Sequence, residues 1–222
     1  MTEADFVLEH AERLLTVATR CAWSFGAADG LDQVLERHVV PRGAWRHPIA
    51  ILQRDAMLMA VTRVVILLDR SKGAVSFQTL YHQLKEPEVQ AAVLAAVEER
   101  RGPELLEPER ANRIAEFLAA YRTIDWGMHG RLKHFRNLDI AHLREQARSK
   151  SITMQELRTL VGVVTSLAVS LQALLQTGVP FHSHLAEEAR NEVEGVVSTS
   201  RAIDASFPLD LGDDHDDPRG EI

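Results

Sequence analysis

The sequence has very little cysteine and no long uninterrupted apolar run. Cys21 is its single cysteine, so no internal disulfide can form, and its place on an apolar helical stripe is typical of an inert buried thiol. The most apolar segment, residues 160–175, is interrupted by small and polar residues, and the N-terminus is acidic rather than signal-like. These absences predict a soluble cytoplasmic protein with no membrane partner.

Motifs that hold cofactors, metals or nucleophiles are also missing. The sequence contains no Gly-x-Ser-x-Gly elbow, no Gly-x-x-x-x-Gly-Lys loop, no Gly-x-Gly-x-x-Gly turn and no His-Glu-x-x-His pair. His129 and His134 are five residues apart, whereas a helical zinc pair needs a spacing of four. We therefore expect no cofactor and no metal, with the histidines isolated on the surface.

Positive charge is scarce overall but concentrated in one region. The formal net charge is −7, of which −6 falls between residue 204 and the C-terminus. Residues 129–150 carry a net charge of +4. A local basic face of this kind is compatible with phosphate binding, although such a run is also typical of a solvated helix face.

The apolar spacing is helical throughout, and no segment alternates as a strand does, so the predicted fold class is all-α, an up-and-down helical bundle. Gly26 and Asp29-Gly30 are expected to end the first helix, and residues 49–68 to form a central, largely buried helix. Three further helices are expected to begin at a Ser76 cap, at Pro87 and at the capping box Thr153-Met-Gln-Glu156. A long helical pattern runs over 109–148 and is expected to bend near Gly127 or Gly130.

Three regions divide the chain. Residues 1–180 are expected to form the bundle, and residues 181–205 a polar helix that packs on it or projects from it. Residues 206–222 are rich in acidic residues and have the composition of a disordered tail.

The string Arg136-Asn137-Leu138-Asp139-Ile140-Ala141-His142 combines the groups that metal-free RNA cleavage requires. Histidine titrates near neutral pH and can remove the proton of a 2′-hydroxyl. Arginine grips phosphate oxygens in pairs, and Asn137 can orient the histidine or donate to phosphate. The alternative is a surface arginine and a core-edge histidine with no joint role.

This string resembles the motif of the HEPN superfamily, which is Arg, four to six residues, then His, commonly with a polar residue after the Arg. The segment 67–76 also resembles HEPN proteins linked to phage abortive infection. The resemblance implies a HEPN-like fold and a metal-independent endoribonuclease in phage defence or a toxin–antitoxin system. It implies His142 as general base and Arg136 as phosphate clamp, with Asn137 orienting. Arg131, Lys133 and Arg144 would steer RNA, and Asp139 would hold His142.

Two features modify this expectation. Many toxin-type members read His-x-Tyr, and the antitoxin modifies that Tyr, whereas Arg144 stands here. Six residues turn a straight helix by about 600°, which places Arg136 and His142 about 120° apart. Either the helix is bent there or two chains share the site, and the resemblance favours a homodimer, with a protein antitoxin or regulator as a further partner. The competing hypothesis is a non-catalytic HEPN-like module that binds a protein or nucleic acid.

Overall fold

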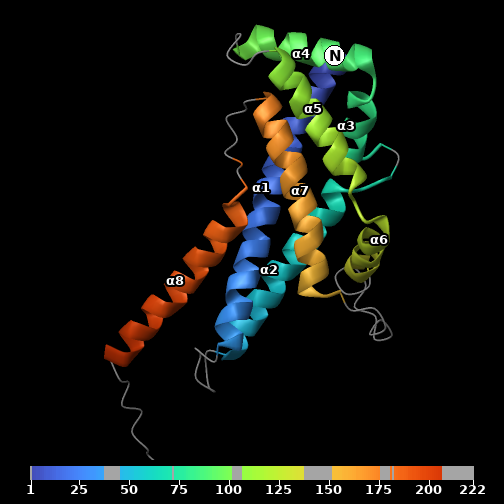
Figure 1. Cartoon of the computed structure of the whole chain (residues 1–222). Coiled ribbons are helices and arrows are strands. Elements are labelled where there is room, and N and C mark those ends of the chain that lie inside the picture. The colour runs from blue at the N-terminus through green and yellow to red at the C-terminus, as the bar shows by residue number, and fades with distance from the viewer. Residues whose placement is uncertain are drawn as a thin grey trace, which may run out of the picture.

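The computed structural model describes residues 2–37, 46–71, 73–101, 107–137, 152–175, 181 and 183–206. Within these ranges the chain is helical and contains no strand, which confirms the all-α fold class (Figure 1). The helices are α1 (Glu3–Glu36), α2 (Arg46–Leu67), α3 (Phe77–Leu84), α4 (Pro87–Arg101), α5 (Glu107–Arg122), α6 (Trp126–Phe135), α7 (Met154–Leu175) and α8 (Leu185–Ser206).

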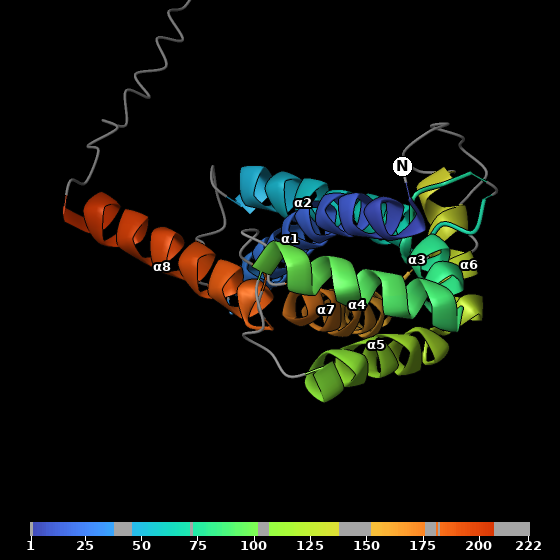
Figure 2. The ribbon, with the colours of Figure 1, turned by 90° about the horizontal axis from the view of Figure 1, so that it is seen from above.

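The core forms where α1 and α7 meet α2 and α5. The view from above shows α2 and α5 on opposite sides of the bundle, with α4 crossing one end of it (Figure 2). Fully buried side chains come from most of these helices and include Leu15, Val64, Phe77, Phe117, Leu160 and Leu167. Cys21 lies in this core as expected, and burial raises the pKa of its thiol to about 12, so the thiol is unreactive.

Helix α1 does not end at its glycines, so the predicted helix end is wrong. It continues to Glu36 because α8 crosses it at these positions. A Cβ atom added at Gly26 would lie 2.1 Å from the Ala186 carbonyl oxygen, and one at Gly30 would lie 2.9 Å from that of Arg190. The glycines therefore allow two helix backbones to approach closely rather than stopping one of them.

Helix α2 was expected to be central and largely buried, and this is wrong for its first half. Its buried residues begin at Ala60, whereas Ile51, Leu52 and Met59 are 47%, 57% and 48% exposed. The reason is that α2 packs mainly along α1, at the edge of the bundle, and touches α7 and α6 far less. Few neighbouring side chains therefore lie beside this part of α2, and its apolar residues stay exposed.

The long pattern expected over residues 109–148 is described as far as residue 137, and over that part the chain forms two helices rather than one bent helix. Helix α5 ends at Arg122, and the Asp125 side chain caps α6 by accepting a hydrogen bond of 2.8 Å from the backbone N–H of Met128. Gly127 and Gly130 lie inside α6 and do not bend it. The turn between the two helices directs α6 toward the loop that follows α2.

Helices α7 and α8 agree more closely with the predictions from the sequence. The capping box is present, with Glu156 N–H donating to Thr153 Oγ1 over 3.1 Å and Thr153 N–H donating to Glu156 Oε2 over 3.0 Å. Helix α7 is long and apolar enough to cross a membrane, but half of that apolar window is buried inside the bundle. Helix α8 packs on α1 with its first half and diverges from the bundle toward Ser206 (Figure 1). The expected acidic tail falls beyond the described residues.

Candidate functional site

The first half of the motif lies at the C-terminal end of α6. Arg136 follows Phe135, the last residue of α6, and begins a π-helical turn with Asn137. Its backbone N–H donates to the carbonyls of Leu132 and Lys133. Its half-buried side chain donates to Asn137 Oδ1 through Nε over 3.0 Å and through Nη2 over 2.6 Å. One edge of the guanidinium is thereby fixed by the next residue in the chain.

The second half of the motif falls beyond residue 137, where the described part of α6 and its following turn ends. His142, Asp139 and Arg144 lie outside the described residues, and their roles stay predictions. Of the residues predicted from the sequence, the structure therefore places Arg131, Lys133, Arg136 and Asn137, all on α6 or immediately after it.

Lys133 lies against the loop that follows α2. Its Nζ is 3.4 Å from Asp69 Oδ1, which also accepts hydrogen bonds from the backbone N–H and the hydroxyl of Ser71. Burial raises the pKa of Asp69, but the hydrogen bonds from Ser71 and Lys133 outweigh it and lower the pKa overall. Asp69 is therefore ionised at neutral pH and neutralises much of the charge of Lys133.

Arg131 lies on another face of α6 and points toward the start of α7. Its Nη2 is 2.5 Å from Glu156 Oε1, the same carboxylate that closes the capping box. The backbone hydrogen bond from Thr153, followed by the one from Arg131, lowers the pKa of Glu156. Arg131 and Lys133 both have carboxylate partners, and within the described part of the chain Arg136 has none.

The loop over residues 69–76 is held by its own hydrogen bonds. Ser76 was expected to cap α3, but its hydroxyl makes no such bond and instead donates to the Asp69 carbonyl over 2.7 Å. The backbone turns at Gly73, whose φ of +82° is a left-handed conformation that suits glycine. The fold thus brings the loop beside α6, so that two segments singled out in the sequence become neighbours.

His129 is buried rather than on the surface, which corrects the sequence expectation. Only 4% of it is exposed, and its Nε2 has no partner among the described residues. Burial, followed by the charge of Lys133, lowers the pKa of His129 below its ordinary value of 6.5, although Asp69 and the Val65 carbonyl oppose this. His129 is therefore neutral at pH 7.

Sequence reasoning missed a row of aromatic rings beside this loop. Tyr81 of α3 stacks on Tyr121 of α5 with ring centroids 4.1 Å apart. Tyr121 meets Trp126 at 5.6 Å, and Trp126 meets His129 edge-on at 5.5 Å. The guanidinium of Arg70 lies 4.7 Å above the Trp126 ring. No local signal could reveal this row, because its members come from three helices.

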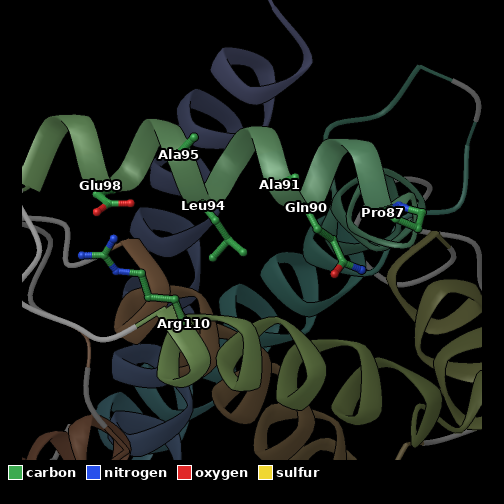
Figure 3. Close-up of a pocket in the computed structure, with 7 residues that line it drawn as sticks. All are labelled: Pro87, Gln90, Ala91, Leu94, Ala95, Glu98 and Arg110. Atoms are coloured by element: carbon green, nitrogen blue, oxygen red, sulfur yellow. The ribbon is translucent and has the colours of Figure 1, made fainter.

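A separate pocket of 330 Å³ lies between α4 and α5. It is lined by Pro87, Gln90, Ala91, Leu94, Ala95, Glu98 and Arg110, and the Arg110 side chain extends toward Glu98 (Figure 3). Helix α4 crosses the end of the bundle away from α6, so this pocket is not part of the motif region (Figure 1).

The residues around α6 offer charge and hydrogen bonding without a metal-ligand set. Among the described residues no group of three His, Cys, Asp or Glu side chains is placed to hold a metal ion. The arrangement supplies a fixed arginine fork, a neighbouring amide, the Arg70 guanidinium and two partly exposed aromatic rings, which are groups that bind phosphate and bases. Comparison with protein-family models, curated proteins and solved structures finds no match for this chain.

Proposed function

We propose that this protein is a metal-independent endoribonuclease of the HEPN type. The observation that carries the proposal is the Arg136–Asn137 pair at the end of α6, six residues before His142 in the sequence. Asn137 holds the Nε edge of the guanidinium, and the remaining N–H groups can donate to a phosphate. A cation held in advance stabilises a developing negative charge without reorganising during the reaction.

The chemistry needs one base and one cation. His142 accepts the proton of a 2′-hydroxyl, whose oxygen attacks the adjacent phosphorus while the bond from phosphorus to the 5′-oxygen breaks. The leaving 5′-oxygen takes up a proton, and the products are a 2′,3′-cyclic phosphate and a 5′-hydroxyl. Arg136 binds the nonbridging phosphate oxygens, and the amide of Asn137 can donate beside it. Asp139 holds His142, while Arg131, Lys133 and Arg144 attract RNA.

The same proposal includes a homodimer with a shared site. On an ideal helix Arg136 and His142 would lie about 120° apart, and α6 already ends at Phe135, so a straight α6 does not bring both to one phosphate. A two-fold axis near α6 lets Arg136 of one protomer meet His142 of its partner. The setting that we propose is phage defence or a toxin–antitoxin system in the cytoplasm, with a protein antitoxin or regulator as a further partner.

The test is cleavage of a single-stranded RNA by the purified full chain in the presence of EDTA. We expect cleavage to persist, and the products to carry a 2′,3′-cyclic phosphate or the 3′-phosphate formed from it. Activity that EDTA abolishes and magnesium restores would exclude this mechanism. RNA that binds but stays intact would instead place the protein with non-catalytic modules.

One observation favours that second, non-catalytic candidate. The exposed apolar face of α2, with Ile51, Leu52, Met59 and Ile66, is a surface of the kind that binds proteins. In a module that only binds a partner, substitution of Arg136 or His142 would change no RNA product, so the same assay separates the two candidates.

A further inference from the structure

We propose that the aromatic row is a track for single-stranded RNA that leads to Arg136. The aromatic row consists of Tyr81, Tyr121, Trp126 and His129, and the flanking cations are Arg70, Lys85, Arg122 and Lys133. This inference deepens the proposed ribonuclease function, because it states how the substrate reaches that same site.

The row runs in one direction across three helices. It starts at Tyr81 on α3, passes Tyr121 near the end of α5 and reaches Trp126 and His129 on α6, which all lie on one side of the bundle (Figure 1). Lys133 is one turn beyond His129, and Arg136 is about one turn beyond Lys133, on the same face of α6. The row therefore ends where the proposed phosphate clamp begins.

Two of the four rings are accessible to solvent, and the other two are buried beneath them. Tyr81 and Trp126 are partly buried against the core and partly exposed, whereas Tyr121 and His129 are only 8% and 4% exposed. The guanidinium over Trp126 belongs to the exposed Arg70, so a base can stack on its outer side or replace it on the indole. Bases of a single strand have free faces for such contacts, and bases inside a duplex do not.

Cations lie beside the two outer rings of this path, two at Tyr81 and one at Trp126. Lys85 Nζ lies 5.9 Å from the Tyr81 ring centroid, and Arg122 Nε donates to the Tyr81 hydroxyl over 3.4 Å. Among the described residues Arg70, Lys85 and Arg122 have no carboxylate partner, although Glu86 follows Lys85 in the chain and Asp125 lies near Arg122. Three cations are thus available for phosphates beside two partly exposed rings, which is the pattern of a sequence-tolerant single-strand site rather than of an apolar protein-binding face.

The experiment measures binding without cleavage. The full chain carrying His142→Ala is titrated in EDTA against a fluorescein-labelled oligouridine, with anisotropy read at several salt concentrations. Arg70→Gln, Lys85→Gln and Arg122→Gln are combined in one variant. Because each phosphate contact on a single strand contributes about 0.7 to the slope of log K against log salt, we expect the slope to shrink by about 2. Arg113→Gln, in the first half of α5 and paired with Glu116, is the control and should leave the slope unchanged.

Stacking is tested separately from charge. Trp126→Leu should weaken binding roughly tenfold with the salt slope unchanged, because it removes a ring but no cation. Trp23→Leu is the matched control, since Trp23 is 37% exposed on α1 and lies outside the row. Melting curves check that each variant is folded. If Trp126→Leu does not fold, the triple variant of the surface cations tests the track by itself.

The outcomes separate this inference from the proposed function. If RNA binding requires Arg136, but the triple variant binds with the same affinity and the same salt slope as its parent, the track is wrong. The ribonuclease assignment would then still stand. If the His142→Ala parent binds no RNA and the wild-type protein cleaves none in EDTA, the proposed function itself fails. Equal binding of a duplex and a single strand would also overturn the track, because a duplex offers no free base faces.

Discussion

At the scale of single residues, Arg136 and Asn137 act as a unit. Arg136→Ala should lower the rate of RNA cleavage by about 10²–10³-fold, because it removes the cation that holds the phosphate. Arg136→Lys should restore only part of the rate, because an ammonium keeps the charge without the two-pronged grip. Asn137→Ala should have a smaller effect than Arg136→Ala, since it releases one edge of a guanidinium that stays in place. Single-turnover cleavage in EDTA measures all three.

Matched histidine variants complete this test. His142→Ala should lower the rate by ~10²–10⁴-fold as the loss of a general base. His134→Ala is the control, because His134 is exposed on α6 and has no assigned role. If His142→Ala lowers the melting temperature but leaves cleavage per folded molecule untouched, His142 is structural and the ribonuclease assignment loses its base.

His129 gives a second prediction at this scale, for stability against pH. Its pKa in the folded state lies below the ordinary value of 6.5, so the unfolded chain binds the proton more readily. The contribution of His129 to the free energy of unfolding should therefore be complete above pH 6.5. It should be lost as the pH drops from 6.5 to the lower pKa of the folded state, by about 1.4 kcal/mol for each unit of difference between the two pKa values. Urea unfolding at pH 7.5 and 5.5 measures this. His129→Gln should lose less stability over the same interval, and an equal loss would show that other groups are responsible.

At the scale of elements, the crossing of α1 and α8 depends on glycine. Alanine favours a helix over glycine by about 1 kcal/mol, yet Gly26→Ala should destabilise the protein, because the new Cβ would lie 2.1 Å from the Ala186 carbonyl oxygen. Gly162→Ala in α7 meets nothing within 4 Å and should be neutral or stabilising. Thermal unfolding and limited proteolysis of α8 measure the difference. Equal melting temperatures for the two variants would mean that the crossing contributes no stability.

At the scale of the whole molecule, a shared site can be detected by mixing subunits. Arg136→Ala and His142→Ala proteins should each be inactive. If the site combines Arg136 of one protomer with His142 of its partner, a mixed dimer keeps one intact site, so an equal mixture should recover about a quarter of wild-type activity. Light scattering should give a dimer mass at micromolar concentration. A monomer mass, or no recovery after exchange has been verified, would contradict the composite site.

The sequence by itself determined the local features. Helical periodicity predicted the all-α class, and Pro87 and the Thr153–Glu156 capping box marked two helix starts correctly, because these signals act within a few residues of one another. The burial of Cys21 followed from its place on an apolar stripe. The candidate motif was also a local signal, and its chemistry could be stated before any contact was known.

Only the tertiary structure decided the features that depend on distant residues. Gly26 looks like a helix end until α8 is seen to pack against it, and the apolar first half of α2 looks like core until its neighbours prove too few. The pairing of Lys133 with Asp69, the burial of His129 and the aromatic row each join segments far apart in the chain. Spacing along the sequence specifies which face of a helix is apolar, but which element covers that face is decided by long-range packing.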